Sequence, residues 1–182
     1  MALIYLIRHG KAAASFTDDV DPGLDATGRL EAETACKDLE SHLPLDLLSS
    51  PLKRAQETAE PLIATTQQNI TIEPRVAEIP SPGLSLEERG PWLQQVMAGN
   101  WSEQAEALKQ WRESMHQCLL SISKDTAIFS HFVAINVALG LAVNSDEVLL
   151  FRPGNGSITV LDNAGGELKL VRRGNEAMTK VN

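Results

Sequence analysis

The feature that most constrains the fold is the alternation of short apolar runs with helix-like segments along the 182-residue chain. The first run, residues 2–7 (Ala-Leu-Ile-Tyr-Leu-Ile), is continuously apolar and rich in strand-forming side chains. Such a run is typical of a central strand that is covered on both faces. Further strand candidates follow at 45–49, 69–79 and 126–129. Strands that alternate with helices in this way predict an α/β fold with a parallel sheet.

The segments between these runs carry helical signals. Asp25 is suited to cap one helix, and Ser50-Pro51 is typical of the cap and first residue of another. Two further strands, at 157–161 and 167–171, lie close enough in sequence to form a hairpin. We therefore predict a three-layer α/β/α sandwich, with a mostly parallel sheet plus one antiparallel strand that the hairpin adds. The predicted helices span residues 25–42, 50–66, 102–121 and 131–143.

Length and composition indicate one domain. Because a domain typically has about 150 residues, we expect residues 1–182 to form a single domain. Residues 80–101 contain three prolines and three glycines and are expected to be irregular. A long irregular loop in a compact domain is usually a lid or a binding segment, so we expect residues 80–101 to set substrate specificity. Cys36 and Cys118 lie in helical segments without a CxxC spacing, which favours free, buried thiols.

The charge balance excludes several classes of function. Acidic residues outnumber basic ones by 24 to 16, the net charge is −8, and aromatic residues make up 4% of the chain. A nucleic-acid partner is therefore not expected. No stretch approaches the ~18 apolar residues of a membrane span, and the N-terminus lacks the order of a secretory signal. We expect a cytoplasmic protein without a membrane partner, either a monomer or a homodimer.

Residues suited to phosphate chemistry directly follow the predicted strands. In a parallel sheet, ligands bind beyond the carboxyl ends of the strands. A helix start favours an anion, and the planar guanidinium group of arginine suits bidentate contact with phosphate. The sequence therefore predicts a local cationic pocket for a phosphoryl group in an otherwise acidic protein. Its candidate residues occur in Arg8-His9-Gly10, in Ser49-Ser50-Pro51 with Arg54, and in Ser130-His131, with Glu78 near the end of the third strand.

Four segments resemble the histidine phosphatase superfamily, which includes the cofactor-dependent phosphoglycerate mutases. Arg8-His9-Gly10 after a strand resembles the signature of the family, and residues 49–59 (Ser-Ser-Pro-Leu-Lys-Arg-Ala-Gln-Glu-Thr-Ala) resemble its second block. Ser130-His131 before an apolar helix resembles the third block, and residues 155–159 (Asn-Gly-Ser-Ile-Thr) resemble a common closing segment. The segments occur in the family's order from residue 3 to about residue 161, which makes the resemblance specific.

The resemblance implies a phosphoenzyme mechanism centred on His9. His9 would attack phosphorus in line and form a phosphohistidine. Arg8, Arg54 and His131 would hold the equatorial oxygens and stabilise the charge that redistributes in the transition state. Gly10 would allow a tight turn and close approach of the substrate. No metal ion or other cofactor is implied, because positive side chains supply the electrostatic stabilisation.

A carboxylic acid is also implied, to protonate the leaving oxygen and then to activate water. Glu78 falls where the family often carries this acid. Because acidic residues are common at strand ends, Glu87 or Glu88 in the expected lid segment is an alternative.

The sequence departs from the pattern of the family after its signature. Lys11 stands where the mutases carry Glu, Ser15 where they carry a phosphate-binding Asn, and Phe132 where Gly often follows the second histidine. We expect these three residues to contact the substrate. Asp18-Asp19 replaces a Gly-Trp pair, and Asn136 replaces a frequent basic residue. These departures weaken the mutase interpretation.

We expect a metal-independent phosphatase that hydrolyses phosphate monoesters, with a small phosphorylated metabolite or a phosphoprotein as its substrate. A phosphohistidine-protein phosphatase and a phosphoglycerate-type mutase are alternatives with the same chemistry. A catalytically silent phosphate-binding module is the alternative outside enzymes. The complete set of Arg8, His9, Arg54 and His131 disfavours that module.

Overall fold

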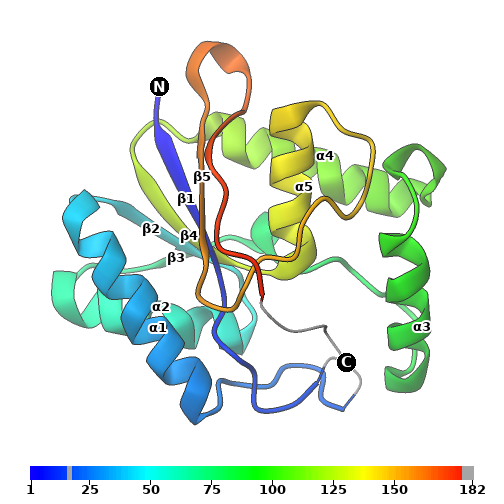
Figure 1. Cartoon of the computed structure of the whole chain (residues 1–182), viewed down its shortest axis with the longest axis horizontal. Coiled ribbons are helices and arrows are strands. Elements are labelled where there is room, and N and C mark those ends of the chain that lie inside the picture. Colours follow the sequence, from blue (N-terminus) through cyan, green and yellow to red (C-terminus); the bar gives the residue numbers. More distant parts are fainter. Residues whose placement is uncertain (16–17, 178–182) are drawn as a thin grey trace.

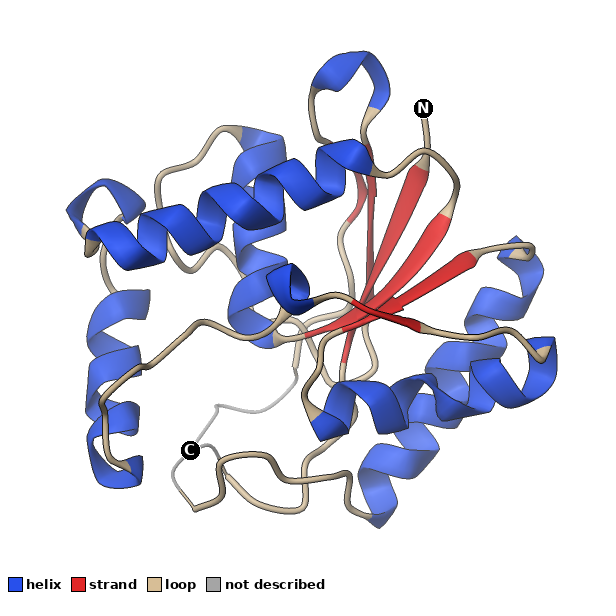
Figure 2. Cartoon of the chain, turned by 180° about the vertical axis from the view of Figure 1, so that it is seen from behind, coloured by secondary structure: helices blue, strands red, loops and turns tan. Residues whose placement is uncertain are grey.

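The computed structural model describes residues 1–15 and 18–177. Its centre is a six-stranded sheet in the order β3-β2-β4-β1-β5-β6, with helices on both faces (Figures 1 and 2). The predicted three-layer α/β/α sandwich is confirmed. The strands are β1 (Leu3–Arg8), β2 (Asp46–Ser49), β3 (Thr71–Ile72), β4 (Thr126–Ser130), β5 (Ile158–Asp162) and β6 (Lys169–Arg172).

Strand β1 lies inside the sheet and is paired along both edges. It pairs in parallel with β4 and antiparallel with β5. Strand β2 pairs in parallel with both β3 and β4, and β6 returns antiparallel to β5. Among the described strands, β5 is thus the one that runs against the others, and the predicted hairpin and single antiparallel strand are confirmed.

The helices form the outer layers. Helices α1 and α2 pack against each other on one face, whereas α4 and α5 cover the other face (Figure 1). Helix α3 lies farthest from the sheet, beyond α4 and α5 (Figures 1 and 2). The helices are α1 (Ala26–Leu39), α2 (Lys53–Thr66), α3 (Leu86–Met97), α4 (Glu106–Ser121) and α5 (Phe132–Val143).

The two faces of β1 supply two separate cores. Ile4 and Leu6 belong to the cluster with α4 and α5, whereas Tyr5 and Ile7 belong to the cluster with α1 and α2. This division follows from the alternation of side chains along a strand. Successive residues of β1 point to opposite faces of the sheet. Because both faces are buried, residues 4–7 are all apolar, which explains the continuous apolar run in the sequence. The end of β1 is therefore held rigidly in the middle of the molecule.

Helix α3 is the largest difference from the sequence-based expectation. The sequence predicts an irregular segment over residues 80–101, and this prediction is wrong for Leu86–Met97, which is helical. The helix begins with a capping box. The Glu88 carboxylate accepts the backbone N–H of Ser85 at 2.8 Å, and the Ser85 side chain accepts the backbone N–H of Glu88. Gly90 and Pro91 hide this signal, because both residues disfavour a helix interior.

The start of α2 also differs from the prediction. The sequence predicts Ser50 as the cap and Pro51 as the first helical residue, but the helix begins at Lys53 with Leu52 as its N-cap residue. The Ser50 hydroxyl instead accepts the backbone N–H of Leu52 at 3.2 Å. The prediction fails because this serine caps a turn that precedes the helix.

Strand β3 is shorter than predicted. It covers Thr71–Ile72 and not the whole of 69–79. Pro74 has no N–H to donate to a neighbouring strand and begins a 3₁₀ turn, Pro74–Val76. The chain therefore leaves the sheet early and turns towards the ends of the central strands.

Both cysteines are free and buried, as predicted. Burial raises the pKa of each thiol to about 11, so both stay protonated at neutral pH and act as core residues. Within the described ranges, no helix has the length and apolar character needed to cross a membrane.

Asn136, in the middle of α5, ties the following segment back onto the helix. Its side chain is fully buried, and Oδ1 accepts the N–H groups of Leu150 and Phe151 at 2.9 and 3.1 Å. Its Nδ2 donates to the carbonyl of Phe132 at 3.0 Å. These bonds satisfy backbone groups that would otherwise be buried without a partner. Asn136 is therefore part of the scaffold and does not replace the basic residue of the family in function.

Replacing Asn136 by Leu should lower the free energy of unfolding by about 2–4 kcal/mol, because each buried N–H that loses its acceptor costs about 1–3 kcal/mol. Urea denaturation followed by circular dichroism measures this change. The control is Gln117→Ala at an exposed position on α4, where a change within about 0.5 kcal/mol is expected. Equal stability of Asn136→Leu and the wild type would contradict this role.

Candidate active site

A cleft of about 970 Å³ opens at the carboxyl end of β1. Arg8 and His9 at the end of this strand, Arg54 in the first turn of α2, and Glu78 all line it. The loop after β1, the first turn of α5 and one side of α3 form the remaining walls. The structure thus brings these residues, which are far apart in sequence, to the sheet edge where α/β proteins bind ligands.

His9 is held in one protonation pattern. Its Nε2 lies 3.1 Å from Nε of Arg54, and its Nδ1 lies 2.7 Å from the carbonyl oxygen of Gly10. The arginine Nε–H can only donate, so Nε2 accepts and carries no proton. The proton of the neutral imidazole is therefore on Nδ1 and is donated to Gly10. Burial, followed by the positive charges of Arg54 and Arg8, holds the pKa of His9 well below its usual value.

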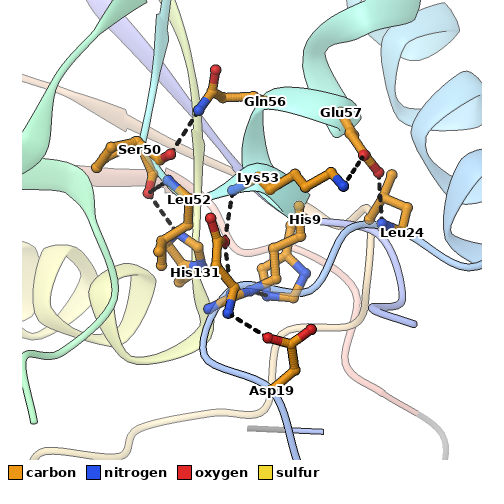
Figure 3. A network of polar contacts seen from close by, with 12 residues as sticks. His9, Asp19, Leu24, Ser50, Leu52, Lys53, Gln56, Glu57 and His131 are labelled. Carbon is orange, nitrogen blue, oxygen red and sulfur yellow. Dashed lines mark hydrogen bonds and ion pairs between the residues drawn. The ribbon is translucent and has the colours of Figure 1, made fainter. Parts of the chain in front are cut away.

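His131 packs against His9, with ring centroids 5.1 Å apart. It is the N-cap residue of α5 and is fully buried. Its Nε2 lies 2.7 Å from the hydroxyl of Ser50, which places both side chains beside the start of α2 (Figure 3). Within the described ranges, its Nδ1 has no hydrogen-bond partner. Burial and then the neighbouring His9 keep the pKa of His131 well below its usual value.

Arg54 is buried, Arg8 is half-buried, and both have few acidic partners. Arg8 donates from Nη1 to the carbonyl of Pro153 at 2.7 Å, and its guanidinium group stacks 5.1 Å from the ring centroid of Phe132. Its Nε has no partner among the described residues. Arg54 lies 3.9 Å from a carboxylate oxygen of Asp21. Burial lowers the pKa of Arg8 to about 10, so the group remains positive at neutral pH and available to an anion.

Glu78 is placed at the N-terminus of α5. Its Oε1 accepts the backbone N–H groups of Ile79, Val133 and Ala134 at 3.0, 3.1 and 3.3 Å. Burial raises the pKa of Glu78 above its usual value, although these N–H groups and Arg54 act in the opposite direction. The carboxyl group is therefore set up to hold a proton at a higher pH than an exposed glutamate.

The alternative acids lie elsewhere. Glu88 is engaged in the capping box of α3, and neither it nor Glu87 lines the cleft. Both side chains are exposed. Glu78 is thus the glutamate that the structure places in the cleft.

The expected substrate contacts fall into two groups. Lys11, Ser15 and Phe132 line the cleft, and Lys11 is paired with Asp25 at 2.9 Å. Gly10 does not line the cleft. A Cβ atom on Gly10 would lie 2.2 Å from the carbonyl oxygen of Gly28, so this glycine is required by close packing against the start of α1.

Sequence reasoning missed several residues of the site. Thr58 accepts the backbone N–H of Gly10 and was not singled out, although it lies inside the second block of the resemblance. Leu93 and Met97 of α3 form an apolar part of the cleft wall, and the capping box that starts this helix was a readable signal. Arg152 also lines the cleft, but no motif in the sequence marks it.

The described residues contain no group of three or more His, Cys, Asp or Glu side chains placed to hold a metal ion. Four basic side chains, Arg8, Lys11, Arg54 and Arg152, line the cleft together with the acidic Asp18, Asp19, Asp25 and Glu78. A dianionic phosphoryl group is the natural ligand for the basic side chains beside two buried imidazoles.

The profile of the histidine phosphatase superfamily, branch 1, matches residues 4–176. The chain belongs to this superfamily. The resemblance that the sequence motifs indicate is confirmed, and so, at the level of the family, is the expected enzyme class of histidine phosphatase. A search of curated proteins by sequence found no match.

Solved structures of other histidine phosphatases share the fold. A phosphoserine phosphatase of Entamoeba histolytica, in complex with 3-phosphoglyceric acid, has a TM-score of 0.76 and 20% identity, with 98% of each chain covered. A mycobacterial glucosyl-3-phosphoglycerate phosphatase, in complex with VO3, has a TM-score of 0.77 and 18% identity, with 97% of this chain and 100% of the other covered. At these identities the likeness establishes the common fold.

Replacing Gly10 by Ala should reduce kcat/KM by about 100-fold, because the new Cβ displaces the segment that carries His9 and a misplacement of about 1 Å has that effect. A phosphate-release assay on an aryl phosphate measures this loss, and a thermal melt reports the accompanying destabilisation. Gly140→Ala on α5 is the control for a glycine substitution, since a Cβ there would lie 3.5 Å from Leu150 Cδ1 and from the Ser145 carbonyl oxygen, which is ordinary van der Waals contact. A Gly10→Ala protein with wild-type kcat/KM would contradict the close-packing role.

Proposed function

We propose that this histidine phosphatase hydrolyses phosphate monoesters through a phosphohistidine on His9. The observation that carries the proposal is the protonation pattern of His9, whose Nε2 keeps a lone pair beside Arg54 at 3.1 Å. A nucleophile must have such a free pair, and a neutral imidazole at neutral pH provides it. Glu78 lines the same cleft and supplies the acid that the reaction needs.

In the first step, the Nε2 lone pair of His9 forms a bond to phosphorus while the bond from phosphorus to the leaving oxygen breaks. Protonated Glu78 gives its proton to that oxygen, so the alcohol leaves uncharged. In the second step, the Glu78 carboxylate removes a proton from water as its oxygen attacks phosphorus. The N–P bond breaks, the electron pair returns to Nε2, and the products are one alcohol and one inorganic phosphate.

The arginines and His131 stabilise the phosphoryl oxygens. Arg54 turns its Nε–H from His9 to a phosphoryl oxygen when the substrate binds, which frees the lone pair. The unpartnered Nε of Arg8 and Nδ1 of His131 are two further buried groups available to these oxygens. Fixed positive groups in a buried site strengthen their interaction with the transition state.

The leaving group would occupy the outer part of the cleft. Leu93, Gln94 and Met97 of α3 line this part, and Arg152 adds a positive charge. We propose that the chain is a single domain, in which residues 80–101 with α3 act as the specificity segment. The cleft suits a small phosphorylated metabolite, as the names of the two structural neighbours also suggest. A phosphoprotein substrate and a cytoplasmic location stay predictions.

Replacing His9 by Ala should abolish hydrolysis of p-nitrophenyl phosphate in the presence of a chelator, with a loss of about 10³-fold or more because the nucleophile is gone. The wild type should also form an acid-labile phosphoenzyme that His9→Ala lacks. His116→Ala on α4 is the matched control and should keep wild-type turnover.

Other outcomes separate the alternatives. Binding of phosphate without turnover or a labelled histidine indicates a silent binding module, and isomerised phosphoglycerate without free phosphate indicates a mutase. Preferred release of phosphate from phosphohistidine proteins indicates the protein phosphatase. Wild-type activity in His9→Ala would overturn the proposal.

The pH dependence of kcat/KM should be bell-shaped. His9 must be neutral, so activity is lost as the pH falls through its lowered pKa, on a limb below about pH 6.5. Glu78 must be protonated, so activity falls as the pH rises through its raised pKa, on a limb above about pH 4.5.

Replacing Glu78 by Gln should remove the alkaline limb and lower the rate by about 10²–10⁴-fold for an alkyl phosphate. The loss should be smaller for p-nitrophenyl phosphate, whose leaving group needs little protonation. Glu87→Gln serves as the control, because its exposed side chain lies outside the cleft. An unchanged profile in Glu78→Gln together with a loss in Glu87→Gln would assign the acid to Glu87.

A further inference from the structure

Four hydrogen bonds close a ring through His9, Gly10, Thr58 and Arg54. The backbone N–H of Gly10 donates to the Thr58 hydroxyl at 3.0 Å, and that hydroxyl donates to the backbone carbonyl of Arg54 at 2.6 Å. The Arg54 side chain donates to Nε2 of His9 at 3.1 Å, and Nδ1 of His9 lies 2.7 Å from the Gly10 carbonyl. All four residues are buried, and Thr58 has no exposed surface.

Each bond of this ring has only one possible direction. The Arg54 carbonyl cannot donate, so the single proton of the Thr58 hydroxyl goes to it, and the same oxygen accepts from Gly10. The Arg54 Nε–H cannot accept, so Nε2 of His9 does. The Thr58 hydroxyl and the His9 imidazole each accept one of these bonds and donate another, so the two bonds at each of these groups strengthen each other.

We propose that Thr58 is a positioning residue that keeps His9 in its reactive tautomer and directs Nε2 towards phosphorus. The proposal rests on the proposed function, because it takes His9 as the nucleophile. Thr58 makes no direct bond of the ring with His9 and acts through its neighbours: it holds the N–H of Gly10, whose carbonyl receives the Nδ1 proton, and it donates to the backbone of Arg54. Since glycine has wide conformational freedom, its carbonyl needs external contacts to stay in one orientation.

The surroundings of Gly10 show what the hydroxyl of Thr58 adds. On one side of Gly10, the peptide unit that carries its carbonyl also carries the N–H of Lys11, which donates to the Glu31 carboxylate at 2.7 Å. Thr58 holds the peptide unit on the other side, so the two contacts together fix the orientation of the glycine. Gly28 closes the space beside Gly10. Thr58 supplies the remaining contact, and it joins the nucleophile segment to the same turn of α2 that carries Arg54.

A helix-stabilising role does not account for this hydroxyl. Thr66, farther along α2, makes the same type of bond to the carbonyl four residues earlier, at 2.8 Å, and accepts the N–H of Gln68 at 3.4 Å. Neither bond involves a residue that lines the cleft. Hydrogen bonds from a threonine hydroxyl to the carbonyl four residues earlier thus occur elsewhere in this helix, whereas the bond from the Gly10 N–H is particular to Thr58.

The ring also fits the course of the reaction. When the Arg54 side chain turns to the phosphoryl group, the bond to Nε2 opens and the lone pair becomes free. The three other bonds do not involve that side chain, so the proton stays on Nδ1. The tautomer is therefore maintained at the moment when Nε2 attacks.

The test compares Thr58→Val, which removes the hydroxyl, with Thr58→Ser, which keeps it, and with Thr66→Val as the control. Single-turnover measurement of phosphohistidine formation should show a rate about 10- to 100-fold lower in Thr58→Val, as expected for a misdirected nucleophile. The KM should change by less than about threefold, and Thr58→Ser and Thr66→Val should stay within about threefold of the wild-type rate.

A second readout does not depend on activity. In the resting enzyme, ¹⁵N NMR of the His9 imidazole should show the Nδ1–H tautomer in the wild type and Thr58→Ser, and a mixture of both tautomers in Thr58→Val. If Thr58→Val does not fold, Thr58→Ala removes the hydroxyl with less crowding. A lower melting temperature with wild-type rate and tautomer would overturn the proposal. The absence of phosphohistidine in the wild type would instead overturn the proposed function.

Discussion

The site depends on burying two positive charges beside an imidazole that has to stay neutral. Removing a guanidinium group from water is costly unless polar groups replace the lost hydration. Here a backbone carbonyl from Pro153 serves Arg8 and the lone pair of His9 serves Arg54. Neither contact carries a negative charge, and the carboxylate of Asp21 lies 3.9 Å from Arg54. Burial and the charges of these two arginines depress the pKa of His9, and under the proposed function the same charges attract the phosphoryl group that His9 attacks.

The rest of the fold holds these groups in place. Strand β1 is paired on both edges and buried on both faces, so its carboxyl end has little freedom. Helix α2 starts at Lys53, directly before Arg54, and this position determines where the guanidinium group of Arg54 enters the cleft. The buried carboxyl group of Glu78 sits over the first turn of α5, whose free N–H groups receive it. Each reactive group therefore comes from the end of a well-packed element.

The sequence was sufficient to predict the layers, the single reversed strand and the edge of the sheet at which the polar residues meet, because apolar runs and their polar followers are local signals. Contacts between segments that are distant in sequence could not be predicted, because no local signal marks them. Gly10 and Thr58 are separated by 48 positions, and nothing in either neighbourhood indicates that their atoms meet. The packing of Gly10 against Gly28 is a similar case. Helix α3 was missed for a different reason, since Pro91 and Gly90 outweigh its capping signal in a local reading.

The two walls of the cleft differ in how deeply they are buried, because one of them is formed by helix α3. Of its residues, Val96 is the one whose side chain is fully buried, whereas the opposite wall is built on the core of the molecule. Leu93 and Met97 on its inner side are partly buried and pack against the core, whereas the strands behind the opposite wall are buried on both faces. Under the proposed function, the groups that recognise the alcohol half of the substrate therefore stand on a peripheral helix, apart from the strand ends that carry the reacting groups.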